Sequence, residues 1–134
     1  MTPKDKWRFA LRVLAAIGFV AAGANHFRVP RTYEQIIPPG YPSPRLLVQI
    51  SGVAEIAGGV GLLIPKLRRS AGIGLIALLI AVFPANLFMA THPRRFGYLG
   101  IPDWVYWARL PFQLVFMAWV WFVAMPGRRR RLPA

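Results

Sequence analysis

The sequence has no cysteine and few groups that act as acids or metal ligands. Its 134 residues include no Cys, two His and four Asp or Glu. Without cysteine, the chain forms no disulfide, thiol redox relay or thiolate metal site. The two histidines, His26 and His92, flank predicted loops and have no second histidine or cysteine beside them. We therefore expect neither haem nor another metal centre.

The shortage of acidic residues leaves a net charge of +13, from 17 Lys and Arg against four Asp and Glu. Such an excess first suggests nucleic acid, but the basic residues alternate along the chain as expected for two sides of a membrane. Eleven of them precede or begin the first apolar run, fill the turn after the second, or follow the fourth: Lys4, Lys6, Arg8, Arg12, Lys66, Arg68, Arg69 and Arg128 to Arg131. The other loops and their flanks hold six: Arg28, Arg31, Arg45, Arg94, Arg95 and Arg109. The positive-inside rule then predicts cytoplasmic N- and C-termini, and we expect no nucleic-acid partner.

Apolar residues make up 56% of the chain and fall in four blocks rather than at an amphipathic spacing. Because about 20 helical residues cross a hydrocarbon core of ~30 Å, we predict spans at about 7–25, 45–64, 70–90 and 104–125. The expected fold is all-α: one integral membrane domain over 1–134, an antiparallel up-down four-helix bundle in the cell (cytoplasmic or inner) membrane. In the basic tail over 126–134, we expect four arginines to hold anionic lipid headgroups at about 1 kcal/mol each: Arg128, Arg129, Arg130 and Arg131.

Two alternatives to this organisation stay open. The first block also fits a secretory signal, because basic residues precede it and Ala22-Gly23-Ala24 follows it. Cleavage there would leave three spans, with the chain starting at Asn25. The four blocks would also suit the buried helices of a soluble protein, although helices that are apolar all round leave almost no polar face.

Two prolines lie inside predicted spans, both toward the outer side. Pro84 and Pro111 each remove a backbone donor and favour a kink. Two kinks in the outer half predict that the helices splay there and leave a cavity. Gly18 and the Gly58-Gly59-x-Gly61 stretch predict close helix packing. The proline-rich loop over 27–44 is expected to hold a short turn on the headgroups.

Strongly polar residues within the spans lie almost entirely in the predicted outer halves. Glu55 is the only carboxylate in an apolar run. It follows Arg45 by ten residues, so it lies about 15 Å deep, near the midplane. A carboxylate at that depth is costly and marks a functional site by default. Seven residues form the predicted polar pocket: Glu55, Arg109, Gln113, Asn86, Ser51, Asn25 and His26.

Three roles for Glu55 stay open. It can pair with Arg109 across the second and fourth spans and lock the helices together. It can stay protonated and donate a hydrogen bond, or it can bind a ligand or pass a proton at the base of the cavity. Gln113 and Asn86 can likewise join helices or line the cavity. A continuous proton or solute pathway fits worst, because no polar residue continues from Glu55 through the inner half to Lys66.

Six short patterns follow one another along residues 23–121: Gly23-x-Asn25-His26-Phe27, Ile37-Pro38-Pro39, Pro42-x-Pro44, Ser51-Gly52-x-x-Glu55, Phe83-Pro84-Ala85-Asn86 and Arg109-Leu110-Pro111-x-Gln113. In this order they resemble the DoxX family of small four-span membrane proteins. The resemblance implies a membrane-embedded four-helix bundle that retains its first span. It implies no single activity. Some members are membrane subunits of a thiosulfate:quinone oxidoreductase, and others are linked to oxidative-stress membrane complexes or, more distantly, to receptor assembly.

The residues and the resemblance together predict a multi-pass membrane protein rather than a stand-alone enzyme. We expect its polar pocket to bind a lipid-like or quinone-like molecule, or the chain to serve as an accessory subunit beside another membrane or redox subunit. The alternative is a non-enzymatic assembly or scaffold protein, whose polar cluster only fixes helix packing.

Overall fold

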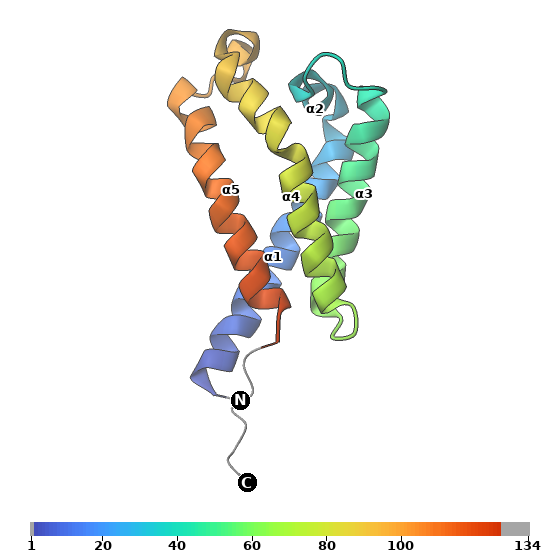
Figure 1. Cartoon of the computed structure of the whole chain (residues 1–134), viewed down its shortest axis with the longest axis vertical. Helices are drawn as coiled ribbons and strands as arrows, with labels where there is room; N and C mark the ends of the chain where they lie inside the picture. Colours follow the sequence, from blue (N-terminus) through green and yellow to red (C-terminus); the bar gives the residue numbers. More distant parts are fainter. Residues whose placement is uncertain (1, 127–134) are drawn as a thin grey trace.

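The computed structural model describes residues 2–126, which contain helices and connecting segments and no strand (Figure 1). In chain order the elements are α1 (Pro3–Arg28), α2 (Pro30–Ile36), α3 (Pro44–Leu63), α4 (Arg68–Thr91), the 3₁₀ helix η1 (Pro93–Leu99) and α5 (Asp103–Ala124). Four of them, α1, α3, α4 and α5, are long and apolar enough to cross a membrane. The all-α prediction is therefore confirmed. The predicted headgroup-binding tail, Arg128 to Arg131, lies outside the described residues.

Three helices begin and end within two residues of the predicted spans: α3, α4 and α5. The first helix is longer than predicted at both ends. Its start is set by Thr2, whose hydroxyl accepts a hydrogen bond from the Asp5 backbone N–H while the Asp5 carboxylate accepts one from the Thr2 backbone N–H. This capping box, followed by Pro3, favours a helix start several residues before the apolar run. The N-terminal turns of α1 project beyond the end of α5 (Figure 1).

The two short helices lie at the opposite end of the molecule. The loop over 27–44 contains α2, which packs against α1, α3 and α4. The second connection contains η1, which the sequence did not predict. It is held by Phe96, which is fully buried and packs edge-on to Phe88 of α4 and near Tyr106 of α5.

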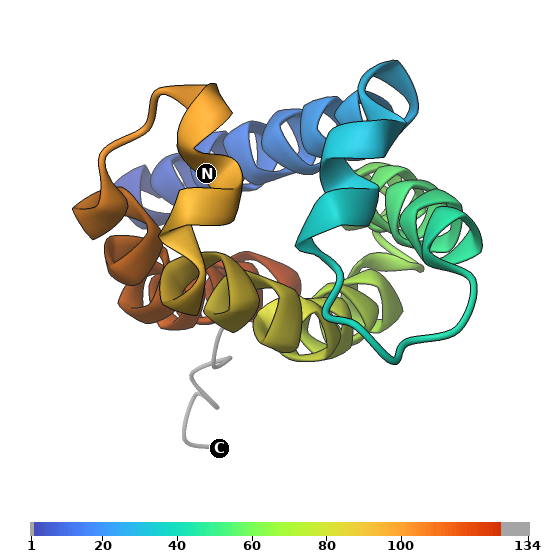
Figure 2. The ribbon, with the colours of Figure 1, turned by 90° about the horizontal axis from the view of Figure 1, so that it is seen from above.

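The four long helices alternate in direction. In Figure 1, α1 and α4 run toward the end that carries α2 and η1, and α3 and α5 run back. Viewed from that end, the long helices surround a common centre, with α2 and η1 across the near side (Figure 2). Extensive contacts join α1 to α3, α3 to α4 and α4 to α5, whereas α1 and α5 share fewer.

The main apolar core lies toward the end away from α2. Its buried residues are contributed by all four long helices: Ala15, Leu62, Leu75, Val120, Val123 and Ala124. Two side chains join α1 to α5 around this core. The Arg12 Nε–H donates to the Val123 carbonyl at 2.9 Å, and the Trp119 Nε1–H donates to the Leu11 carbonyl at 3.1 Å. The sequence predicted this apolar half, and the structure shows it closed by packing.

Glycines set the close crossing of α1 and α3. A Cβ on Gly23 would lie 2.6 Å from the Gly52 carbonyl oxygen, and one on Gly59 would lie 2.9 Å from the Ala16 carbonyl oxygen. The predicted packing role of the Gly58–Gly61 stretch is therefore confirmed. The packing role predicted for Gly18 is wrong, because a Cβ there would meet nothing within 4 Å. Gly18 instead faces the cavity described next.

Candidate ligand-binding cavity

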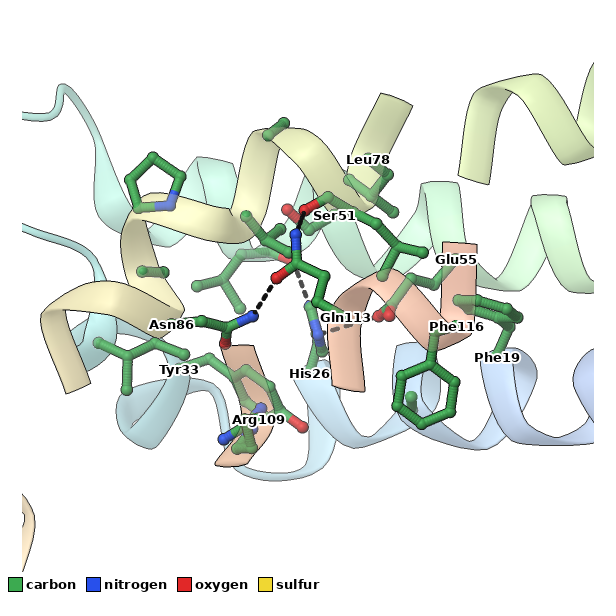
Figure 3. A pocket seen from close by; sticks show the side chains of 18 of the residues that line it. Phe19, His26, Tyr33, Ser51, Glu55, Leu78, Asn86, Arg109, Gln113 and Phe116 are labelled. Carbon is green, nitrogen blue, oxygen red and sulfur yellow. Dashed lines mark hydrogen bonds and ion pairs between the residues drawn. The ribbon is translucent and has the colours of Figure 1, made fainter. Parts of the chain in front are cut away.

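A cavity of about 640 Å³ lies among the four long helices at the end that carries α2 (Figure 3). Its walls are mainly apolar side chains from every helix except η1. Phe19 and Trp119 line it and also pack on the apolar core, so the core forms the floor of the cavity. The sequence predicted a cavity in this half of the helices. Both α4 and α5 stay helical through their prolines, and Pro84 itself lines the cavity.

Glu55 of α3 faces His26 of α1 across the close helix crossing. The His26 Nε2 and Glu55 Oε2 atoms are 3.0 Å apart, and the two side chains are only 11% and 16% exposed. That distance is short enough for an ion pair, although the ring N–H does not align for a hydrogen bond, and no described group donates one to Oε2. The other ring nitrogen, Nδ1, lies 3.1 Å from the Val48 carbonyl, and the ring stacks on Tyr33 at 4.1 Å between centroids.

Of the three roles left open for Glu55, pairing with Arg109 is not what the structure shows. His26 takes that place because Gly23 and Gly52 let α1 and α3 approach closely just beside it. Arg109 belongs to α5, which packs mainly on α4. It lines the cavity from the other side, and its NH1 group reaches only the Met89 Sδ atom, at 3.6 Å.

A second pair of polar side chains, Asn86 and Gln113, joins α4 to α5. The Asn86 Nδ2–H donates to Gln113 Oε1 at 2.9 Å, and the Gln113 Nε2–H donates to the Leu79 carbonyl. Pro84 leaves this turn of α4 short of one backbone donor, at the carbonyl of Ile80 next to Leu79. Gln113 is 5% exposed and therefore supplies a buried donor where the α4 backbone is interrupted.

The remaining predicted residues differ in their surroundings. Ser51 lines the cavity, and its hydroxyl donates to the Leu47 carbonyl one turn earlier, at 2.8 Å. Asn25 does not line the cavity. Its Nδ2–H donates to the Tyr33 hydroxyl and its Oδ1 accepts from Arg28, both at 2.8 Å, so it fixes the end of α1 to α2. Six of the seven predicted pocket residues thus face one cavity, and Asn25 supports it from outside.

Among the polar residues that line the cavity, sequence reasoning missed Tyr33 and Tyr41. The sequence placed their loop on the membrane surface, but α2 folds back so that the Tyr33 ring stacks on His26. The only signal was helical spacing, since Tyr33, Ile36 and Ile37 share a face that would cover an apolar opening.

The chemistry of the cavity is hydrogen bonding within an apolar chamber. A carboxylate, an imidazole, two amides and three hydroxyls lie among aliphatic and aromatic walls, with one guanidinium on the α5 side. Within residues 2–126, no group of three or more His, Asp or Glu side chains gathers as a metal-binding set. The arrangement suits a molecule with a small polar head and an apolar body.

Comparison with known proteins places the chain in a family. Residues 14–124, which run from within α1 to the end of α5, match the family described as a domain of unknown function, DUF8561. The match covers most of the chain, and the protein belongs to this family. No curated protein and no solved structure matches the sequence.

Proposed function

We propose that this member of the DUF8561 family is a multi-pass membrane protein whose cavity binds a lipid-like or quinone-like molecule. The four apolar helices would form an antiparallel up-down bundle in the cell membrane. Their exposed large apolar side chains, such as Ile17, Ile50, Ile80 and Leu114, would face lipid. A protein in water rarely exposes so many such side chains over its whole length.

The proposed orientation places both termini in the cytoplasm. Basic residues gather at the end of the molecule where α1 begins and where α3 turns into α4, including Lys4, Lys6, Lys66 and Arg69. Cytoplasmic flanks of short membrane spans carry this excess. The cavity, α2 and η1 would then lie in the outer half of the bilayer and at its outer surface.

The observation that carries the binding proposal is the Glu55–His26 pair inside the cavity. A buried carboxylate in a span is costly and is retained where it has a task. Here its partner is an imidazole, and both groups line the same apolar chamber as Ser51 and Gln113. A quinone or lipid headgroup with oxygen acceptors and hydroxyl donors would bind at this level, with its apolar part along Phe19 and Phe116.

The resemblance to the DoxX family supports a place beside a membrane redox complex. The protein would then hold the quinone-like or lipid-like molecule as an accessory subunit, while a partner subunit carries the redox chemistry. No residue of the cavity needs to change oxidation state in this role.

The test is mass spectrometry of lipids and quinones that co-purify with the full-length protein. The wild type should retain one molecular species at near one equivalent above the bulk lipid. Glu55→Gln should lower that species by about tenfold to a hundredfold, because one charge-assisted hydrogen bond contributes roughly 1.5–3 kcal/mol. Gly18→Leu should also lower it, because a Cβ at Gly18 points into open space in the cavity. Ala21→Leu, on the exposed face of α1, is the matched control and should leave it unchanged.

A second candidate function is that of an assembly or scaffold protein. The observation that favours it is that Asn86, Gln113 and Ser51 satisfy one another or the backbone, as residues that only fix helix packing would. It predicts that Gly18→Leu leaves function intact, and that wild type and Glu55→Gln give the same featureless lipid profile. That result would rule out the binding proposal.

A further inference from the structure

Three arginines gather at the end of the molecule opposite the cavity. Arg8 and Arg12 lie one turn apart on α1, and Arg68 begins α4. We call them the arginine cluster. All three side chains are partly buried, whereas long charged side chains at a helix end usually extend into water.

Each guanidinium is held in place by the end of another helix. Arg12 donates through Nε to the Val123 carbonyl near the end of α5, and Arg68 donates through Nε to the Leu62 carbonyl near the end of α3, at 3.0 Å. The Arg8 guanidinium lies over the Phe122 ring, 4.6 Å from its centroid. Since Leu62 and Val123 belong to the same apolar core, these anchors bring the three charges to one place.

In the part of the chain that the structure describes, no carboxylate forms an ion pair with the cluster. Arg12 lies within electrostatic range of both Arg68 and Arg8, so both charges repel its own. The one ion pair among residues 2–126 is that of His26 with Glu55, at the far end. Asp5 lies one turn before Arg8 and within electrostatic range of it, but its carboxylate hydrogen-bonds Thr2 and forms no ion pair with Arg8. The Arg8 Nε atom is buried and has no described acceptor.

The remaining donors suit a phosphate. Arg12 and Arg68 use only Nε for the backbone, which leaves the paired terminal NH₂ groups of each guanidinium for another acceptor. Guanidinium groups match the geometry of phosphate oxygens and bind them with charge-assisted hydrogen bonds. An anion bound here would also remove the repulsion within the cluster.

The surroundings favour a lipid headgroup over a soluble anion. Trp7 and Phe9 flank Arg8 on α1 and are 71% and 53% exposed, and Trp121 beside Phe122 on α5 is 57% exposed. These aromatic rings would face acyl chains and the headgroup boundary, where tryptophan is enriched. We propose that Arg8, Arg12 and Arg68 form a binding site for the phosphate of an anionic phospholipid. The site rests on the membrane-spanning part of the proposed function but not on the cavity ligand.

The test is native mass spectrometry of the full chain in detergent, titrated with phosphatidylglycerol or phosphatidylcholine. The wild type should bind phosphatidylglycerol in preference. Arg12→Gln together with Arg68→Gln should weaken that binding about thirtyfold, because each arginine near a membrane surface strengthens the binding of an anionic lipid by about fivefold. A glutamine side chain at either position can still donate a hydrogen bond to the carbonyl near the end of the neighbouring helix, Val123 of α5 or Leu62 of α3. Arg8→Gln removes no backbone hydrogen bond and should weaken binding about fivefold, so it carries the test if the double variant fails to fold.

The matched control is Arg45→Gln together with Arg94→Gln, which removes the same charge from exposed positions at the cavity end. It should keep the phosphatidylglycerol preference. The proposal is overturned if the wild type shows no preference, if neither Arg8→Gln nor the double variant changes it, or if the control loses as much. It is also overturned if replacing Arg128 to Arg131 by glutamine abolishes the preference alone, or if inorganic phosphate at equal concentration displaces the lipid. Because the lipid is offered in micelles, an error in the proposed orientation or cavity ligand leaves this test unaffected.

Discussion

Gln113 shows how one side chain links a backbone break to a cavity. It is the only polar side chain in the buried core of residues 2–126. Its amide oxygen accepts from Asn86, and its amide nitrogen donates to Leu79 in the turn of α4 that Pro84 interrupts. Buried donors and acceptors that lose their partner cost more than the hydrogen bond itself gains. Gln113 is therefore needed for stability whether or not a ligand touches it.

Gln113→Leu should destabilise the protein by about 1–3 kcal/mol, because it leaves the Asn86 amide without its acceptor and removes the side-chain donor to the Leu79 carbonyl. Thermal unfolding of the detergent-solubilised protein measures this as a lower midpoint. Adding Asn86→Leu should recover part of the loss, since one unpaired amide is removed. Leu114→Ala, at the next position and 68% exposed, is the control. Equal midpoints for Gln113→Leu and Leu114→Ala would contradict the role assigned to Gln113.

The sequence predicted which polar residues face the cavity but not how they pair. Depth along a helix follows from counting residues, so Glu55 and Gln113 were expected at similar depths, with Ser51 one turn above Glu55. The partner of Glu55 depends on how the helices rotate against each other, and a one-sequence pattern does not give this rotation. His26 was placed at the rim, yet the close crossing at Gly23 and Gly52 brings it to the carboxylate.

At the scale of elements, the crossing of α1 and α3 decides the geometry of the cavity. Gly23 and Gly52 allow backbone contact on one side of α1, while Gly18 faces open space on another. The sequence alone did not show which glycine of α1 contacts another helix, because Gly18 and Gly23 lie in the same apolar run. The bounds of the long helices followed from the apolar runs. The short helices α2 and η1 did not, since they are stabilised by packing of Tyr33 and Phe96 on other helices.

Substitutions at two glycines of α1 should therefore have opposite effects. Gly23→Ala should destabilise the protein by about 1–3 kcal/mol, because its methyl group would meet the α3 backbone at Gly52. Gly18→Ala should be neutral or stabilise by up to about 1 kcal/mol, because alanine favours the helix and meets no neighbour. Thermal unfolding of the two variants side by side is the measurement. Equal effects would mean that α1 and α3 do not cross closely at Gly23.

At the scale of the whole molecule, the two ends differ in packing and in charge. One end holds the apolar core and the arginine cluster, and the other holds the cavity beneath α2 and η1. The sequence indicated this asymmetry through the placement of its basic and polar residues. It did not indicate that two arginines of α1 would lie against the end of α5, or that Arg68 of α4 would lie against the end of α3, because those contacts require the folded arrangement.

The proposed orientation can be tested directly, because the chain has no cysteine to interfere with labelling. Arg94→Cys, exposed in η1, should react with a membrane-impermeant maleimide on intact cells. Lys66→Cys, exposed in the turn between α3 and α4, should react only after the cells are permeabilised. The reverse pattern would place the termini outside, and labelling of both sites on intact cells would exclude the four-span arrangement.

In the proposed membrane arrangement, the projecting start of α1 would let the protein tolerate different bilayer thicknesses. At 1.5 Å per residue, the 20 residues of α3 are about 30 Å long and match a hydrocarbon core, whereas the 26 residues of α1 reach about 39 Å. The additional length lies in the first turns of α1. These turns carry three basic residues, Lys4, Lys6 and Arg8, and Trp7, which suit the interface between membrane and water. A thicker membrane can draw these turns inward by a residue or two while α3, α4 and α5 tilt less. Hydrophobic mismatch would then be absorbed by the end of α1 and not by the helix crossings that shape the cavity.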